Sequence, residues 1–267
     1  MSVLAGLSAA CASEAPPQAG PESTGPGGAG SGGARSEGVW VSIFDGETLD
    51  GWTPKIAGHP LGENFAGTYY VEDGAIKTTY AGYGDDFDQR YGNLFYETPH
   101  DHYRLRLEYR FTGEQAPGAE DWARLNSGVL YHAQPPGTVP LDSGFPVALE
   151  AQFLAEGAHA PTTGNMCSLE TYVTIDGAPR HEHCIGGPVP SRPLGEWVRF
   201  ELHAAPDGTF RHYIDGELAF AFTAPFYDAP HAWADGMTVE GGYFSLQSES
   251  HPVEFRGIEL MVLDGDG

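Results

Sequence analysis

Apolar and polar residues alternate along most of the chain after residue 38. In residues 103–111, tyrosine, leucine and phenylalanine occupy every second position and charged residues occupy the others. Residues 198–203 and 243–247 follow the same pattern. Successive side chains of a β-strand point to opposite faces, so a period of two predicts strands with one buried face. We find no convincing amphipathic helix, no internal repeat and no apolar run long enough to span a membrane.

Turn signals separate these segments. Asp73-Gly74 lies between the predicted strands 69–72 and 75–80, and Asp215-Gly216 lies between 210–214 and 217–222. An Asp-Gly pair between two alternating segments is a strong hairpin signal. In the last segment, 253–262, the apolar positions shift by one at Gly257, which predicts a β-bulge. Strands at this spacing predict an all-β sandwich of two antiparallel sheets.

Residues 147–154 form the most informative of these segments. Glu150 and Gln152 lie on the same predicted face, between apolar neighbours. A carboxylate and an amide are costly to bury without partners, so we expect them to line a pocket. The alternative is a half-exposed strand whose polar face meets water.

Other predicted strands carry polar residues of the same kind, Asn126, His132, Gln247 and Arg256, and His251 lies in the turn before the last strand. Asn126 and His132 are six positions apart and therefore share a face of one strand. Each residue also has a structural explanation, since Arg256 could simply pair with Glu254 and His132 could cap a sheet edge. Together they predict a polar floor of the kind that a sugar cleft requires.

Residues 1–38 do not resemble the rest of the chain. The first ten are apolar and end in small residues before Cys11, which resembles a bacterial lipoprotein signal whose cysteine becomes lipidated. No Lys or Arg precedes the apolar run, unlike an export signal. Residues 12–38 are rich in Gly, Pro, Ser and Ala and predict a flexible tether. We expect an exported, lipid-anchored protein with one domain at 39–264; the alternative is a disordered cytosolic tail.

Two further cysteines, Cys167 and Cys184, are 17 positions apart. In an oxidising compartment such a pair indicates one disulfide. A metal site is the alternative, because His181 and His183 lie beside Cys184. Zinc, however, requires four ligands at recognisable spacing, and the set is incomplete.

The net charge of the chain disfavours anionic partners. It is −24, and Lys55 and Lys77 are the only two lysines. Such a surface repels phosphate backbones and anionic membranes, so we expect no nucleic acid partner and membrane attachment only through the lipid. A neutral carbohydrate meets no such repulsion.

Four motifs in order resemble a known family. Residues 43–52 (IFDGETLDGW), 126–129 (NSGV), 149–152 (LEAQ) and 241–256, from GGYFSLQ to HPVEFR, are similar to segments of the 3-keto-disaccharide hydrolase family. The resemblance covers residues 39–264. It implies a concanavalin A-like jelly roll with the site on the concave sheet. It also implies substrates whose glucosyl unit carries a ketone at C3.

The resemblance implies a site made of Asn126, Glu150, Gln152, Gln247 and Arg256, with His132 and His251. One departure is Ser248-Glu249-Ser250, which stands between Gln247 and His251 where many relatives have a His-Gly pair soon after the glutamine.

A ketone at C3 acidifies the proton at C2, so a base can form an enolate and the group at C1 can leave. Water then adds, which gives net hydrolysis. This chemistry requires a base, an acid and an electrophile. We expect Glu150 as base, His132 as acid, and Arg256 or a divalent cation as electrophile.

Two alternatives remain open. Ordinary glycoside hydrolysis requires two carboxylates about 5 Å apart, or about 6.5–9.5 Å for inversion. The next carboxylate on the Glu150 strand, Glu156, lies about 20 Å away in an extended chain, so a partner would have to come from another strand. A lectin-like module that only binds sugar is the second alternative, since the fold supports it equally.

Overall fold

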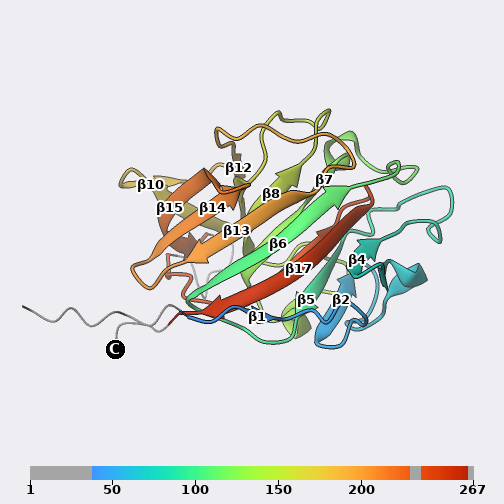
Figure 1. Cartoon of the computed structure of the whole chain (residues 1–267), viewed down its shortest axis with the longest axis horizontal. Coiled ribbons are helices and arrows are strands. Elements are labelled where there is room, and N and C mark those ends of the chain that lie inside the picture. Colours follow the sequence, from blue (N-terminus) through green and yellow to red (C-terminus); the bar gives the residue numbers. More distant parts are fainter. Residues whose placement is uncertain (1–37, 229–235, 264–267) are drawn as a thin grey trace, which may run out of the picture. The chain divides into compact units, whose positions relative to one another are not determined.

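The computed structural model describes residues 38–228 and 236–263, which form two antiparallel β-sheets packed face to face (Figure 1). They belong to one compact unit, Gly38–Gly267. The predicted all-β sandwich is confirmed. The helices of the described residues are short 3-10 turns: η1 (Phe65–Gly67), η2 (Asp121–Ala123) and η3 (Pro136–Thr138).

The first sheet has ten strands. Their order across the sheet is β11 (Ala178–Arg180), β10 (Thr171–Ile175), β15 (Glu217–Tyr227), β14 (Thr209–Ile214), β13 (Val198–Ala204), β6 (Tyr103–Phe111), β17 (Val253–Val262), β4 (Ala75–Thr78) and β3 (Tyr69–Glu72), with β1 (Val41–Ser42) paired to β17. Strands β14, β13, β6 and β17 lie side by side across the front of Figure 1.

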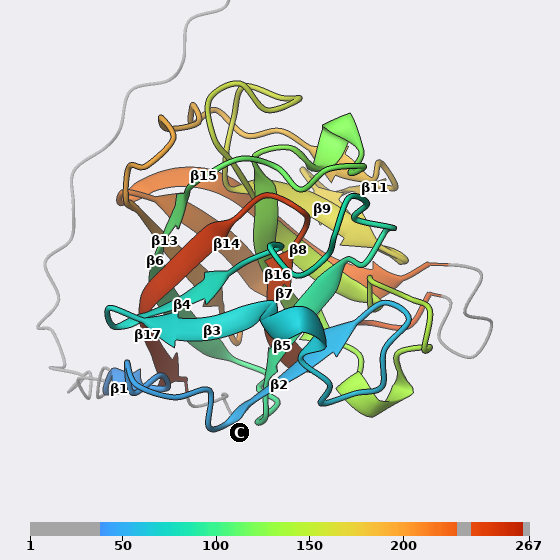
Figure 2. The ribbon, with the colours of Figure 1, turned by 90° about the vertical axis from the view of Figure 1, so that its right-hand side faces the viewer.

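The second sheet has seven strands, and it carries the site. Their order is β12 (Cys184–Ile185), β9 (Asn165–Leu169), β8 (Ala148–Leu154), β7 (Asn126–Ala133), β16 (Tyr243–Ser248), β5 (Gly92–Tyr96) and β2 (Trp52–Ile56). Figure 2 shows β8, β7 and β16 as neighbours near the middle of this sheet.

The core lies between the two sheets and is rich in aromatic rings. In β6, every second residue is buried, as the alternating pattern predicts. The ring of Tyr109 from β6 stacks on Phe153 from β8, with centroids 4.0 Å apart, and Phe200 from β13 meets the same phenylalanine edge-on. Stacked and edge-on contacts of this kind add to the stabilisation from apolar burial.

Both predicted Asp-Gly hairpins are confirmed. Asp73 and Gly74 join β3 to β4, and Asp215 and Gly216 join β14 to β15. All four residues have positive φ, between 51° and 83°. Two consecutive positive φ values characterise the type I′ turn, whose twist matches that of the paired strands.

Two bulges change which face the side chains meet. The predicted bulge at Gly257 is confirmed, because the register of β17 against β6 shifts between Arg256 and Glu259. A second bulge, in β7, was not predicted. Opposite β16, the register shifts between Leu130 and Ala133, and His132 within this gap has a φ of 47°. A bulge moves every later side chain of its strand to the other face.

The predicted disulfide between Cys167 and Cys184 is confirmed. It joins β9 to the edge strand β12, where the two residues pair in register. In the described part of the chain, no helix has the length and apolar character needed to cross a bilayer. Cys11 and the predicted tether lie outside the described residues, apart from Gly38.

Candidate active site

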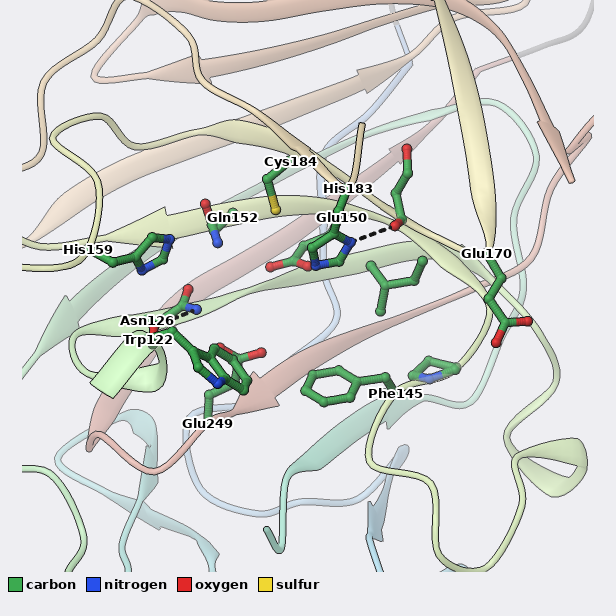
Figure 3. Close-up of a pocket in the computed structure, with 13 residues that line it drawn as sticks. Trp122, Asn126, Phe145, Glu150, Gln152, His159, Glu170, His183, Cys184 and Glu249 are labelled. Atoms are coloured by element: carbon green, nitrogen blue, oxygen red, sulfur yellow. Dashed lines mark hydrogen bonds between the residues drawn. The ribbon is translucent and has the colours of Figure 1, made fainter. Parts of the chain in front are cut away.

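The outer face of the second sheet holds a cavity of about 570 Å³ (Figure 3). Its floor comes from β7, β8 and β9, and loops form its walls. The residues that line it are Trp122, Asn126, Phe145, Pro146, Glu150, Gln152, His159, Ser168, Leu169, Glu170, His183, Cys184 and Glu249. A cavity of this size accommodates a small ligand such as a mono- or disaccharide.

Strand register brings the predicted floor residues together. Gln152 of β8 pairs with Gly128 of β7, and Glu150 pairs with Leu130. Paired residues share a face, so Asn126, two residues before Gly128, also points to the cavity side. Asn126, Glu150 and Gln152 are buried and line the cavity. The structure therefore brings these three predicted residues together.

Gly128 leaves the space in which Glu150 and Gln247 meet. A Cβ atom at this position would lie 2.9 Å from Oε1 of Glu150 and 2.6 Å from Oε1 of Gln247. The two side chains come from β8 and β16, the strands on either side of β7. Any residue other than glycine would push them apart. The side chain of Gln247 is fully buried next to Glu150.

Glu150 is not the only buried carboxyl in the cavity. Glu249, at the end of β16, also lines it, and only 3% of this residue is exposed. Burial raises the pKa of Glu249 to about 8. The pKa of Glu150 is raised well above its usual range, first by burial and then by repulsion from Glu249. The amide of Gln247 lies beside the Glu150 carboxyl and offsets part of this rise.

Two coupled carboxyls in low dielectric cannot both ionise easily. At neutral pH the pair therefore retains at least one proton. A pair that holds one proton offers both an acid and a base within one cavity, which is the arrangement that acid-base catalysis uses.

Sequence reasoning missed Glu249. We treated Ser248-Glu249-Ser250 as an insertion before His251. A signal was nevertheless present, because Ser245, Gln247 and Glu249 alternate and therefore share a face of one strand. In the structure, the polar row of β16 continues into Glu249 and brings it to the cavity.

The amide of Gln152 has a fixed orientation. Its Oε1 accepts a hydrogen bond from Nδ2 of Asn165 (3.1 Å), and Asn165 is itself held by Thr162 and by the backbone N–H of Gly187. The NH2 group of Gln152 is therefore left to donate into the cavity. Asn126 provides a hydrogen-bond acceptor, since its buried Oδ1 has no partner within the described residues. The cavity thus presents both a donor and an acceptor for a polar ligand.

Aromatic rings form one wall of the cavity. Trp122 lies on η2 and is 42% exposed. It stacks on Tyr91, with centroids 5.3 Å apart, and Tyr91 also contacts Phe145. An exposed indole supported from behind by other rings provides a flat apolar surface at the cavity mouth, of the kind on which a sugar ring can pack.

The structure does not bring His132 to this cavity, and its predicted place beside Asn126 is wrong. The bulge in β7 turns its ring toward the space between the sheets, where it contacts Tyr103 and Phe210. Burial lowers its pKa to about 4. His132 borders a separate cavity of about 330 Å³, so the role of acid to a ligand beside Glu150 does not fit it.

The prediction that Arg256 belongs to the same site is also wrong. It belongs to β17 in the other sheet, where its Nε donates to Glu108 (2.7 Å) and its guanidinium lies over the ring of Trp197. Its expected partner, Glu254, instead pairs with Arg110. Arg256 therefore cannot act as the electrophile of this cavity.

His251 follows β16 in the turn to β17 and is not among the residues that line the cavity. Its ring meets Phe111 edge-on, and burial lowers its pKa to about 4. The alternative of a metal site at His181, His183 and Cys184 also fails, because Cys184 is bonded to Cys167. Elsewhere in the described ranges, no three His, Cys, Asp or Glu side chains converge as a metal site would require.

Comparison with solved structures supports the fold. The chain is similar to a Bacillus subtilis protein of unknown function with a galectin-like fold, with a TM-score of 0.53, 14% identity, and coverage of 84% of this chain and 96% of that one. It is also similar to the laminarinase from Rhodothermus marinus, with a TM-score of 0.50, 10% identity, and coverage of 84% and 98%. At these identities the likeness concerns the jelly-roll fold alone. No curated protein matches the chain.

The sandwich is of the jelly-roll class, and the family match supports a carbohydrate-active protein. The family model described as a 3-keto-alpha-glucoside-1,2-lyase-like domain matches residues 39–261. The chain belongs to this family, and the predicted resemblance is confirmed.

Gly128 provides a direct test of the packing beneath the carboxyl pair. We expect Gly128→Ala to lower the free energy of unfolding by about 1–3 kcal/mol, because the new methyl group would overlap Glu150, Gln247 and the carbonyl of Ala151. Gly137→Ala is the matched control, since no atom lies within 4 Å of a Cβ placed there. Urea denaturation of both variants makes the measurement. Equal stability of the two would contradict the proposed packing.

The raised pKa of Glu249 predicts a pH-dependent stability. In the unfolded chain this carboxyl loses its proton near 4.5, but in the folded protein near 8. The folded state binds the extra proton between these values, so Glu249 destabilises the fold progressively as the pH rises from about 4.5 to 8. Glu249→Gln removes this titration.

The stability of the Glu249→Gln variant relative to wild type should therefore rise across this window, by at most about 1.4 kcal/mol per pH unit. Urea titrations at pH 5, 6.5 and 8 measure the difference. A difference that does not change with pH would show that Glu249 ionises normally.

Proposed function

We propose that the protein is a hydrolase of 3-keto-glycosides that removes the C2 proton, expels the group at C1 by β-elimination and then adds water. The observation that carries this proposal is the pair of buried carboxyls, Glu150 and Glu249, in one sugar-sized cavity. The motifs that match the family supply the substrate class.

The protonation of the pair suits each step. One carboxylate takes the proton from C2, and the electrons form the enolate of the C3 ketone. Collapse of the enolate breaks the C1–O bond, and the other carboxyl protonates the departing oxygen. Water then adds at C1 and loses its proton to the pair, while C2 regains a proton. Each carboxyl alternates between acid and base, so no net proton is gained or lost.

We assign the base to Glu150, whose strand lies at the centre of the cavity floor, and the acid to Glu249. Both carboxyls have raised pKa values. Each is therefore better suited to exchange protons at neutral pH than an exposed glutamate is. Because His132 faces away from the cavity, Glu249 replaces it as the proposed acid.

The enolate oxygen needs a hydrogen-bond donor once Arg256 is excluded. The NH2 group of Gln152 fits this role, because Asn165 already occupies its carbonyl oxygen. A donor held in place before the reaction stabilises developing negative charge without reorganising. Asn126 can accept a hydrogen bond from a sugar hydroxyl, and Trp122 can pack against a second ring.

Ordinary glycoside hydrolysis remains the second candidate, and Glu249 is the observation that favours it. The sequence lacked a second carboxylate near Glu150, whereas the structure supplies one from another strand. The two reactions differ at C2, since direct displacement at C1 leaves the C2–H bond intact. A binding module without turnover is the remaining alternative.

We further propose that the protein is exported and attached to a membrane through a lipid on Cys11. The pattern of small residues before Cys11 motivates this proposal, and the Cys167–Cys184 disulfide supports it, since disulfides persist in oxidising compartments. Metabolic labelling with a palmitate analogue should mark wild type but not Cys11→Ser. Labelling that survives this substitution would contradict the anchor.

The function is tested with Glu150→Gln, which keeps the shape of the side chain and removes the proton acceptor. Turnover of a 3-keto-glucoside should fall by about 10²–10⁴-fold while binding persists. Glu156→Gln is the control, because Glu156 is exposed and lies just beyond the same strand. It should retain wild-type turnover.

The isotope content of the product decides the mechanism. In heavy water, wild type should yield a product with deuterium at C2, because a solvent proton returns there after elimination. The uncatalysed exchange of the product ketone is measured alongside and subtracted. Turnover without C2 deuterium would indicate glycosidase chemistry, and binding without turnover would indicate a lectin-like module.

A further inference from the structure

The disulfide belongs to the same face as the proposed base. Cys167 of β9 pairs in register with Glu150 on one side and with Cys184 on the other. Residues in register point to the same face, so the sulfur bridge lies on the cavity side of the sheet beside Glu150. Cys184 itself lines the cavity. The bridge is therefore part of the floor of the site as well as a link between two strands.

The residue before Cys184 is His183, whose ring forms part of the cavity wall (Figure 3). Its Nδ1 lies 2.9 Å from the backbone carbonyl of Ser168. A carbonyl can only accept, so Nδ1 carries the proton and donates it. The neutral ring then has an unprotonated Nε2. Within the described residues, Nε2 has no protein partner, which leaves it as an acceptor for a ligand.

This orientation depends on the edge of the sheet. Strand β12 has only two residues, and His183 precedes it on an exposed segment. The backbone N–H of Ser168 donates to the carbonyl of His183 (2.7 Å), so His183 is joined to Ser168 by two hydrogen bonds. The disulfide connects the adjacent residues, Cys167 and Cys184. A short edge strand is weak by itself, and the disulfide adds a covalent link between it and β9.

We propose that His183 is a substrate-binding residue whose Nε2 accepts a hydrogen bond from a sugar hydroxyl, and that the Cys167–Cys184 disulfide positions it. For its ligand this proposal rests on the proposed function. The sugar site is then complete only when the Cys167–Cys184 disulfide is formed. His181 lies two residues away but differs from His183, because it pairs with Asp228 and does not line the cavity.

The first experiment needs no ligand. Long-range proton–nitrogen NMR of the full chain reports which ring nitrogen of each histidine carries the proton, and His183→Gln assigns the signal. In wild type, His183 should show the Nδ1–H form. In Cys167→Ala/Cys184→Ala, the signal should move to the averaged form of a free histidine, while the buried His212 signal stays unchanged and reports an intact fold. An unchanged His183 signal would overturn the positioning role.

The second experiment measures binding of methyl 3-keto-α-glucoside by calorimetry in the Glu150→Gln background, where turnover is strongly slowed. His183→Ala should weaken binding by about 3–10-fold, the effect of one neutral hydrogen bond. Loss of the disulfide should weaken it equally, and the two changes together should weaken it no further. His181→Ala should have no effect.

The outcomes separate the two proposals. Additive effects, or an unaffected affinity in His183→Ala, would overturn the role of His183 while the proposed function stands. If the ligand does not bind to the Glu150→Gln protein at all, the proposed function fails and His183 is not a residue that binds this sugar. The NMR result would then still decide whether the disulfide orients the ring.

Discussion

The site depends on the burial of two carboxyl groups on the same face of one sheet. Charged carboxylates in a poorly solvated cavity are unstable. Burial raises the pKa of both carboxyls and repulsion from Glu249 further raises that of Glu150, so the fold favours protonation of the pair. This cost is tolerated because the surrounding strands fix the pair from both sides of β7. The arrangement gives the cavity an acid and a base from two carboxyl groups alone.

Several features exist to support this pair. Gly128 leaves room for Glu150 and Gln247 to meet above β7. Asn165 orients the amide of Gln152, and the disulfide fixes the sheet edge next to Glu150. Because these contacts join four neighbouring strands, a change in any one of them reaches the carboxyls through the sheet. The strand register that builds the sheet therefore also positions the two carboxyls.

Local sequence patterns correctly predicted the features that depend only on residues close together in the chain. Strand β6, both Asp-Gly hairpins and the bulge at Gly257 are examples. His132 was misplaced because of a bulge at which the backbone of Gly242, just before the neighbouring strand β16, approaches His132 and Ala133 closely. Alternation along β7 alone contains no information about that contact.

Arg256 was misplaced for a different reason. Both sheets have an outer polar face, and alternation does not reveal to which sheet a strand belongs. Glu249 was missed because we interpreted Ser248-Glu249-Ser250 as an insertion relative to the family motif. We did not recognise Glu249 as a continuation of the polar row of β16. The prediction succeeded for Asn126, Glu150 and Gln152, whose strands β7 and β8 are direct neighbours in the sheet.

The central claim is that Glu150 and Glu249 share a retained proton at neutral pH. It is tested most directly by following the side-chain carboxyl carbons of both residues by NMR as the pH is raised, with Glu150→Gln and Glu249→Gln used for assignment. We expect at least one of the two carboxyls to keep its proton through neutral pH and to ionise near 8 or above. Two independent titrations near 4.5 would contradict it.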